Sequence, residues 1–272
     1  MLQSTLFRLL GFVFIGLAFT TCKRDDDGTA PDTSINLFSV QKDIDLGMQL
    51  RDEIAANPTE YPVLDETQYP DAYGHLRRIR DEILNSGEVK YKDDFEWEVY
   101  IIQDDNVLNA FCAPGGYIYV YTGLIKYLTS EHELAGVMGH EIAHADRRHS
   151  TDQLTQQYGL SILLELALGE NQGLLSDVAA NLITLKYSRN AEVEADDFSV
   201  VYLCPTDYMA DGAAGFFEKL EAQGQGGSTP AFLSTHPSPD SRIDNIKDKR
   251  TELNCTGTEV DGQYQDFINS LP

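Results

Sequence analysis

Apolar residues recur at helical spacing over most of this 272-residue chain. A spacing of three and four residues places them on one face of a helix, so each such segment predicts an amphipathic helix. The helix that ends at Leu203 is stopped by Pro205, and a further short helix is expected after the segment 234–243. The main predicted helices cover residues 35–56, 71–86, 130–150, 152–168, 174–186, 190–203 and 207–221.

Strand patterns are confined to the region between the second and third of these helices. Residues 95–103 alternate apolar and acidic side chains and are rich in β-formers, and residues 109–123 read as two short strands around a Pro-Gly-Gly turn. We therefore expect a mainly helical α+β fold with a small antiparallel sheet ahead of the 130–150 helix.

The 130–150 helix carries the clearest chemical pattern. Ser130 and Glu133 form an S-x-x-E capping box at its start. His140 and His144 are four residues apart, so their directions differ by about 40° and both imidazoles can reach one Zn²⁺. Glu141 lies beside that face, as suits a general base acting on a water molecule at the metal.

A catalytic zinc ion needs a third protein ligand. A metzincin would continue the motif with glycine and histidine, but this chain has Arg147 and Ser150 at those positions. A thermolysin-like pattern would use Glu165 with an aspartate four residues later, where Gly169 stands. The first alternative fails and the second is weak.

Glu192 is the better candidate for the third ligand. Asp196 follows it at i+4, on the same helical face, where it can orient a zinc-bound histidine. The small Ala195 and Ser199 beside them would let another helix approach closely.

Four sequence blocks follow one another along the chain: N-A-F-x-x-P-G-G at 109–116, H-E-x-x-H at 140–144, S-R-x-x-E-x-E-A-D at 188–196 and H-P-x-x-x-x-R-I at 236–243. Together they resemble the HtpX, Oma and BepA-like gluzincin metalloendopeptidases, a family that includes the CAAX prenyl endopeptidase. The resemblance implies a zincin-like catalytic domain with one Zn²⁺ per chain, His140, His144 and Glu192 as ligands, and Glu141 as catalytic base. The chain looks like the soluble periplasmic branch, although Cys112 departs from the commoner aliphatic residue.

Zinc peptidases commonly bind the substrate backbone along an edge strand. The second strand of the predicted hairpin suits this role, with Gly115, Gly116, Tyr117 and Ile118 as the expected substrate strand. The alternative is a plain hairpin that belongs to the core.

His236 and Arg242 are expected to face the metal site without being among its three basic ligands. They follow a glycine-rich segment, 224–227, and a mobile loop there could carry His236 to the open metal position. His236 would then block water as a fourth ligand or stabilise the developing oxyanion, with Arg242 as a second donor or an anchor. The alternative is a His-Pro turn and an Arg242 that pairs with a carboxylate.

The first 21 residues read as a signal peptide, with Arg8 ahead of an apolar run. The cysteine that follows Thr20 and Thr21 resembles a bacterial lipoprotein signal, which implies lipidation at Cys22; simple secretion is the alternative. Residues 22–34 read as a flexible tether, 35–250 as the peptidase domain and 251–272 as a polar C-terminal tail.

The formal net charge of −24 argues against nucleic acid or an anionic membrane surface as a partner. Membrane contact is therefore expected only through lipid on Cys22. Cys204 and Cys255 are the expected disulfide in an oxidising compartment, and Cys112 reads as a buried apolar residue.

The sequence thus predicts a lipid-anchored zinc metalloendopeptidase of the cell envelope, facing the periplasm or the cell surface. Its expected substrates are proteins or peptides, including misfolded envelope proteins. The alternative is a chaperone-like or binding lipoprotein with a latent or structural metal site. The pattern leaves the oligomeric state open.

Overall fold

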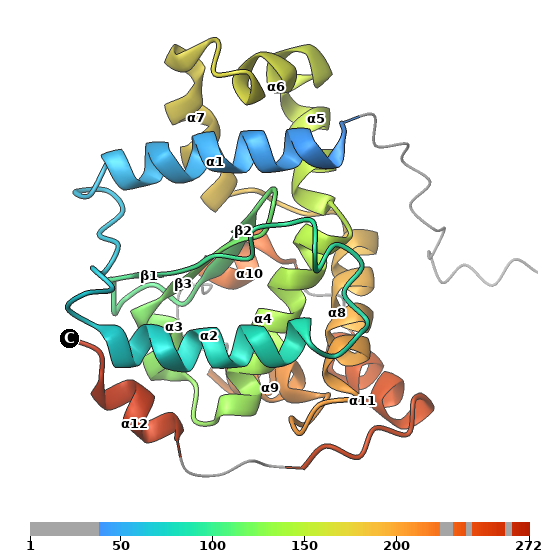
Figure 1. The fold of residues 1–272 in the computed structure, drawn as a ribbon. Helices are drawn as coiled ribbons and strands as arrows, with labels where there is room; N and C mark the ends of the chain where they lie inside the picture. Colours follow the sequence, from blue (N-terminus) through green and yellow to red (C-terminus); the bar gives the residue numbers. More distant parts are fainter. Residues whose placement is uncertain (1–37, 224–230, 238–240, 259–262) are drawn as a thin grey trace, which may run out of the picture. The chain divides into compact units, whose positions relative to one another are not determined.

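The computed structural model describes residues 38–223, 231–237, 241–258 and 263–272 (Figure 1). Cys22, the predicted tether and the glycine-rich segment 224–227 lie outside these residues. The strands are β1 (Val99–Ile102), β2 (Ala110–Ala113) and β3 (Tyr117–Tyr121). The helices are α1 (Val40–Ala56), α2 (Pro70–Leu84), α3 (Thr122–Tyr127), α4 (Glu131–Asp146), α5 (His149–Tyr158), α6 (Leu160–Ala167), α7 (Gln172–Ile183), α8 (Arg189–Leu203), α9 (Gly212–Gln223), α10 (Ala231–Thr235), α11 (Arg242–Glu252) and α12 (Tyr264–Asn269).

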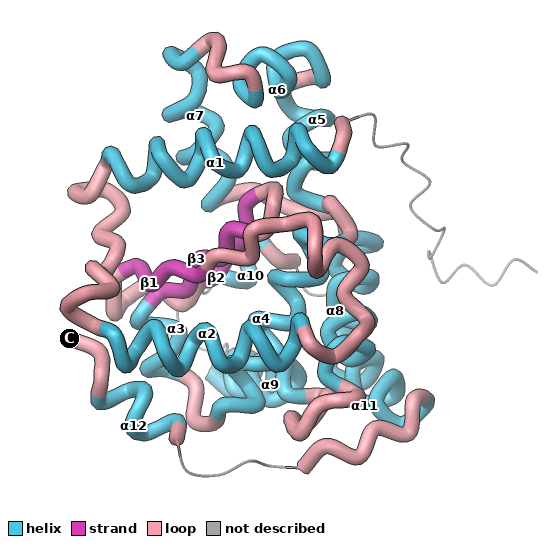
Figure 2. The backbone as a smooth tube through the Cα atoms, in the orientation of Figure 1, coloured by secondary structure: helices cyan, strands magenta, loops and turns pink. Residues whose placement is uncertain are grey.

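The fold is mainly helical, as expected (Figure 2), but its sheet is mixed rather than antiparallel. The strand order is β1-β3-β2, so β3 is the central strand. β2 and β3 form the predicted antiparallel hairpin, whereas β1 pairs with β3 in parallel. The local pattern identified the strands, but the order in which they pair depends on the path of the connection between β1 and β2.

Side chains alternate between the two faces of the sheet, and each face packs on different helices. Phe111 and Tyr119 face α1, where Leu46 and Leu50 are fully buried. The opposite face packs against α2 and α4, and Figure 1 shows α1 and α2 on opposite sides of the sheet. The sheet is thus the middle layer between two groups of helices.

Helix α4 is buried along its whole length. Its glycines let neighbouring helices approach: a Cβ at Gly136 would come within 2.1 Å of the Ala213 backbone nitrogen, and one at Gly139 within 2.8 Å of Ser199 Oγ. Ser199 Oγ also donates to the Gly136 carbonyl at 2.8 Å. The close approach predicted from the small residues of α8 is therefore confirmed, and it brings α8 against the face of α4 that carries His140.

Three predicted segments differ from the structure. The helix expected over 130–150 ends at Asp146, and its last two residues begin α5. Residues 152–168 were expected to form one helix, but Gly159, with φ of +84°, breaks it into α5 and α6. The C-terminal segment, expected to be a polar tail, contains α12, where Phe267 is fully buried and Tyr264 Oη donates to the Ile125 carbonyl at 2.6 Å. Its two aromatic residues join the core, which explains the departure.

The predictions for the three described cysteines are confirmed. Cys204 and Cys255 form a disulfide that ties the end of α8 to the segment after α11. Cys112 is free and fully buried in β2. Among the described residues, no helix is both long and apolar enough to cross a membrane.

Candidate metal centre

Helix α4 supplies two histidines to a buried cluster. Ser130 caps the helix, since its Oγ accepts from the Glu133 amide at 3.4 Å, and this confirms the first half of the capping box. One turn before the helix ends, the Nε2 atoms of His140 and His144 lie 3.0 Å apart. Both rings are almost completely buried, and burial lowers their pKa values well below the usual range. Neutral imidazoles are the form that binds a metal ion.

Helix α8 brings a carboxylate to the same point. Ser188 caps α8 by accepting from the Ala191 amide, and Glu192 follows in the first turn. The Glu192 oxygens lie 3.4 Å from His144 Nε2 and 3.5 Å from His140 Nε2. Burial opposes ionisation of Glu192, but His236 and His144 outweigh it and hold its pKa well below the usual value.

The residues present fit a zinc ion. Two imidazole nitrogens and one carboxylate match a three-ligand catalytic site, which keeps one position open. Ligand atoms from His140, His144, Glu192 and His236 all lie within 4.8 Å of one another. The described part of the chain contains no other such group.

Glu141 is the fully buried carboxyl beside this cluster. Neither of its oxygens has a hydrogen-bond partner among the described residues, and the nearest imidazole nitrogen, Nε2 of His236, is 3.5 Å away. Burial raises the pKa of Glu141 to about 7, helped by Glu192 and opposed by His236. An orphaned carboxyl with a near-neutral pKa can both accept and donate a proton.

His236 and Arg242 both lie inside the site. His236 Nδ1 is 3.0 Å from a Glu192 oxygen, and the ring stacks on Phe232 with centroids 4.3 Å apart. Arg242 is almost completely buried; its Nη2 donates to Asp196 Oδ1 at 2.7 Å, and its Nε lies 2.7 Å from Asp196 Oδ2 as part of the ion pair. Arg242 Nη2 is also 3.1 Å from Glu192.

Asp196 lies behind the cluster rather than in it. Its Oδ1 is 2.8 Å from His140 Nδ1, on the side of the ring away from the metal ligands. Burial raises the pKa of Asp196 to about 6 despite Arg242. Asp196 therefore occupies the orienting position that the i+4 spacing indicated.

The structure corrects the expected substrate strand. Gly115 and Gly116, with φ of +78° and +89°, form the turn between β2 and β3. Tyr117 and Ile118 lie in β3, which is paired with β1 on one side and β2 on the other. Because both edges of β3 are occupied, no peptide can add to it.

Sequence reasoning missed three residues around His144. Tyr187 stacks on the His144 ring with centroids 3.8 Å apart, and His149 Nδ1 lies 3.0 Å from His144 Nδ1. Glu194 in turn contacts His149, and the hydrogen bonds from His149 and Arg147 lower its pKa to about 2. Tyr187 directly precedes the 188–196 block and Glu194 lies within it, so proximity to that block was the available signal.

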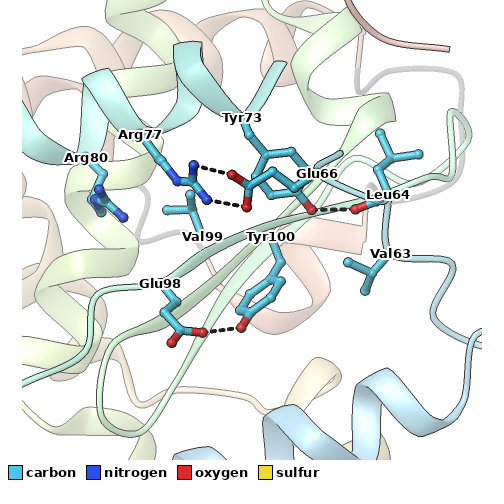
Figure 3. A pocket seen from close by; sticks show the side chains of 9 residues that line it. All are labelled: Val63, Leu64, Glu66, Tyr73, Arg77, Arg80, Glu98, Val99 and Tyr100. Carbon is cyan, nitrogen blue, oxygen red and sulfur yellow. Dashed lines mark hydrogen bonds and ion pairs between the residues drawn. The ribbon is translucent and has the colours of Figure 1, made fainter. Parts of the chain in front are cut away.

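A separate cavity of about 440 Å³ lies at the β1 edge of the sheet (Figure 3). Arg77 pairs there with Glu66, and Tyr100 Oη donates to Glu98. The lining shares no residue with the metal cluster, so the cavity is not part of the candidate site. It is lined by Val63, Leu64, Glu66, Tyr73, Arg77, Arg80, Glu98, Val99 and Tyr100.

Comparison with known proteins identifies the region that carries the cluster. The profile of peptidase family M48 matches residues 70–250. The mitochondrial metalloendopeptidase OMA1 of Arabidopsis thaliana is 36% identical over 151 residues, covering 55% of this chain and 31% of that protein. The metalloprotease YcaL of Escherichia coli is 32% identical over 191 residues, covering 67% of this chain and 70% of that protein.

The beta-barrel assembly-enhancing protease of Yersinia pestis is 28% identical over 257 residues, covering 88% of this chain. The chain spans about a third of the Arabidopsis protein and about half of the Yersinia protein. All members of the metal cluster fall within the matched residues 70–250.

Proposed function

Because the chain belongs to peptidase family M48, we propose that it is a zinc-dependent metalloendopeptidase that hydrolyses internal peptide bonds. The observation that carries this proposal is the fully buried Glu141 carboxyl beside His140, His144 and Glu192, which has no hydrogen-bond partner among the described residues. A closed structural zinc site has no use for such a group.

His140, His144 and Glu192 would hold the metal ion. When bound, Zn²⁺ supplies a Lewis acid that lowers the pKa of water and polarises the scissile carbonyl. Glu141 accepts the proton of the attacking water and then passes it to the leaving amine. Its pKa of about 7 suits both steps, since proton transfer is most efficient when the pKa lies near the working pH.

The replacement Glu141→Gln tests this role. The variant keeps the shape of the side chain but cannot take up a proton, so we expect near-stoichiometric zinc and a kcat lowered by about 10²–10⁴-fold. Zinc content and cleavage of an unfolded protein substrate are measured together, with and without a chelator. Full activity of the variant would refute the mechanism. Chelator-insensitive holding of the substrate without cleavage would instead indicate a binding protein.

His236 is proposed to control access to the open metal position. Its 3.0 Å contact with Glu192 and its membership of the metal cluster support a role as a fourth ligand that excludes water. If it does so, His236→Ala raises peptidase activity. If it stabilises the oxyanion, the same variant lowers kcat with little change in KM. Unchanged kinetics and zinc affinity would leave only a structural turn.

Arg242 is proposed to act as an anchor in this site rather than as an oxyanion donor. Its guanidinium is already engaged by Asp196 and Glu192, and it lies over the Phe217 ring, 3.9 Å from the centroid. These contacts hold the side chain against α8 and leave it little freedom to follow a substrate.

The cell envelope is the proposed setting, with quality control of envelope proteins as the proposed role. The names of the bacterial relatives and the N-terminal pattern ending at Cys22 support this proposal. Lipid on Cys22 would supply location alone. Cys22→Ser should therefore release the mature protein from the membrane fraction without changing its peptidase activity, and a processed variant that remains membrane-bound would contradict the anchor.

A further inference from the structure

Behind His144 lies His149, and behind His149 lies Glu194; neither belongs to the metal cluster. Nδ1 of His149 lies 3.0 Å from Nδ1 of His144, and Nε2 of His149 lies 3.3 Å from an oxygen of Glu194. The other Glu194 oxygen accepts from Arg147 Nε at 2.7 Å. His149 is 4% exposed. We propose that His149 and Glu194 are positioning residues that fix the tautomer and orientation of His144 for zinc binding; this inference rests on the proposed zinc site.

The geometry separates the two sides of the His144 ring. Its Nε2 faces His140 Nε2 and Glu192, which is the side where the ligand atoms converge. Its Nδ1 points the opposite way, toward His149. His149 therefore lies behind a ligand and does not belong to the metal cluster.

The order of donors and acceptors follows from this placement. A neutral His144 that offers its Nε2 lone pair to zinc must carry its proton on Nδ1. That proton needs an acceptor, and Nδ1 of His149 is the atom within reach. His149 must then carry its own proton on Nε2, where the Glu194 carboxylate accepts it. This one arrangement of protons gives a hydrogen bond from His144 to His149 and another from His149 to Glu194.

The local fold explains why these groups meet. Arg148, with φ of +65°, lies in the left-handed region between the end of α4 and the start of α5. This turn folds the first residue of α5, His149, back against the last turn of α4. Glu194 comes from α8, two residues beyond Glu192, so one helix supplies both a proposed metal ligand and the carboxylate that accepts from His149.

Tyr187 restrains the face of the same ring. It stacks on His144 at an interplanar angle of 24°, while the His149 ring meets His144 at 72°. The Tyr187 hydroxyl shares a 2.9 Å hydrogen bond with Ser150 Oγ, which donates to the Cys112 carbonyl of β2 at 2.9 Å. Stacking limits tilting of the ring but supplies no acceptor for Nδ1, so the acceptor role falls to His149.

Two substitutions at position 149 separate hydrogen bonding from packing. In His149→Asn, the side-chain amide oxygen occupies the position of the imidazole Nδ1 and can still accept from His144. His149→Leu fills space but accepts nothing. Because outer partners of zinc histidines contribute about 10–100-fold to metal affinity, we expect a loss of that size in the leucine variant and recovery of most of it in the asparagine variant.

Glu194→Gln tests the tautomer directly. Arg147 can only donate, so it holds the amide oxygen and turns the NH₂ group toward His149 Nε2. His149 must then place its proton on Nδ1, facing the Nδ1 proton of zinc-bound His144. We expect zinc affinity to fall by about 10–100-fold although size and shape are unchanged.

The measurement is zinc affinity of the full chain by competition with a chromophoric chelator, together with the absorption spectrum of the Co²⁺-substituted protein. His75→Asn, a histidine that stacks on Phe267 away from the cluster, is the matched control and should match the wild type. Zinc affinity as tight as wild type in His149→Leu and Glu194→Gln would overturn the proposal, as would equal losses in His149→Asn and His149→Leu. If the leucine variant does not fold, a wild-type affinity in Glu194→Gln overturns it alone. The result is independent of Glu141→Gln, which tests hydrolysis at undiminished zinc affinity.

Discussion

The two histidines proposed to bind zinc, His140 and His144, lie one turn apart on α4, yet their supports differ. The support of His140 consists of Asp196 and Arg242, which are buried and carry opposite charges. The support of His144 consists of His149, Glu194 and Arg147. The His149 ring is buried, whereas the Glu194 and Arg147 side chains are roughly a quarter to a third exposed. Removing one partner of a buried ion pair is strongly destabilising, whereas an exposed pair contributes little to stability because water solvates both charges. We therefore expect breaking the ion pair behind His140 to cost more stability than breaking the ion pair at the outer end of the His144 support.

The largest effect is expected on the His140 side. Arg242→Ala leaves Asp196 buried without its cation, and breaking a buried pair in this way costs about 3–5 kcal/mol. Urea denaturation of the metal-free protein should show the full loss in the free energy of unfolding. A loss below about 1 kcal/mol, the value for exposed pairs, would remove the proposed difference between the supports.

Removing the disulfide is expected to have the next largest effect. Cys204 and Cys255 are 51 residues apart and enclose α11, the helix that begins with Arg242. A serine double variant should lose about 2–4 kcal/mol of stability. Reduced wild type is the control, and it should match the variant. Identical denaturation of oxidised and reduced wild type would contradict this prediction.

Asp196→Asn is the counterpart of Glu194→Gln on the His140 side. Both variants replace a carboxylate with an amide, and both are measured by zinc affinity. Oδ1 of Asp196 meets both Arg242 Nη2 and His140 Nδ1, and Oδ2 meets Arg242 Nε. Whichever way it turns, an amide at this position points its NH₂ group at a donor and offers His140 a weaker acceptor than the carboxylate. We expect affinity to fall by about 10–100-fold, measured by chelator competition. An affinity equal to wild type would mean that the tautomer of His140 is fixed by other contacts.

The smallest effect is expected at the outer end of the His144 support. Arg147 is about a third exposed, and its ion pair with Glu194 is therefore worth about 1 kcal/mol or less. Arg147→Ala should change the stability of the metal-free protein by no more than that amount. A loss as large as that of Arg242→Ala would show that both supports are equally rigid.

The sequence by itself determined the parts of the site that lie on single helices. The i, i+4 spacing of His140 and His144, the Ser130 cap and the small Ser199 of α8 depend on local periodicity, which a helix converts directly into shared faces. The same reasoning identified Glu192 and Asp196, which the structure brings to the metal side and the far side of the histidines. Cys204 and Cys255 were paired correctly because few cysteines remained to choose from.

Only the tertiary structure decided what meets across elements. The pairing of β1 with β3 made Tyr117 and Ile118 central rather than exposed for strand addition, because strand order depends on the path of the chain and not on the pattern of any one strand. The approach of His149 to His144 depends on one left-handed residue, Arg148, and on the docking of α8. Neither leaves a periodic signal in the sequence, since a hydrogen bond between separate helices is set by packing rather than by spacing.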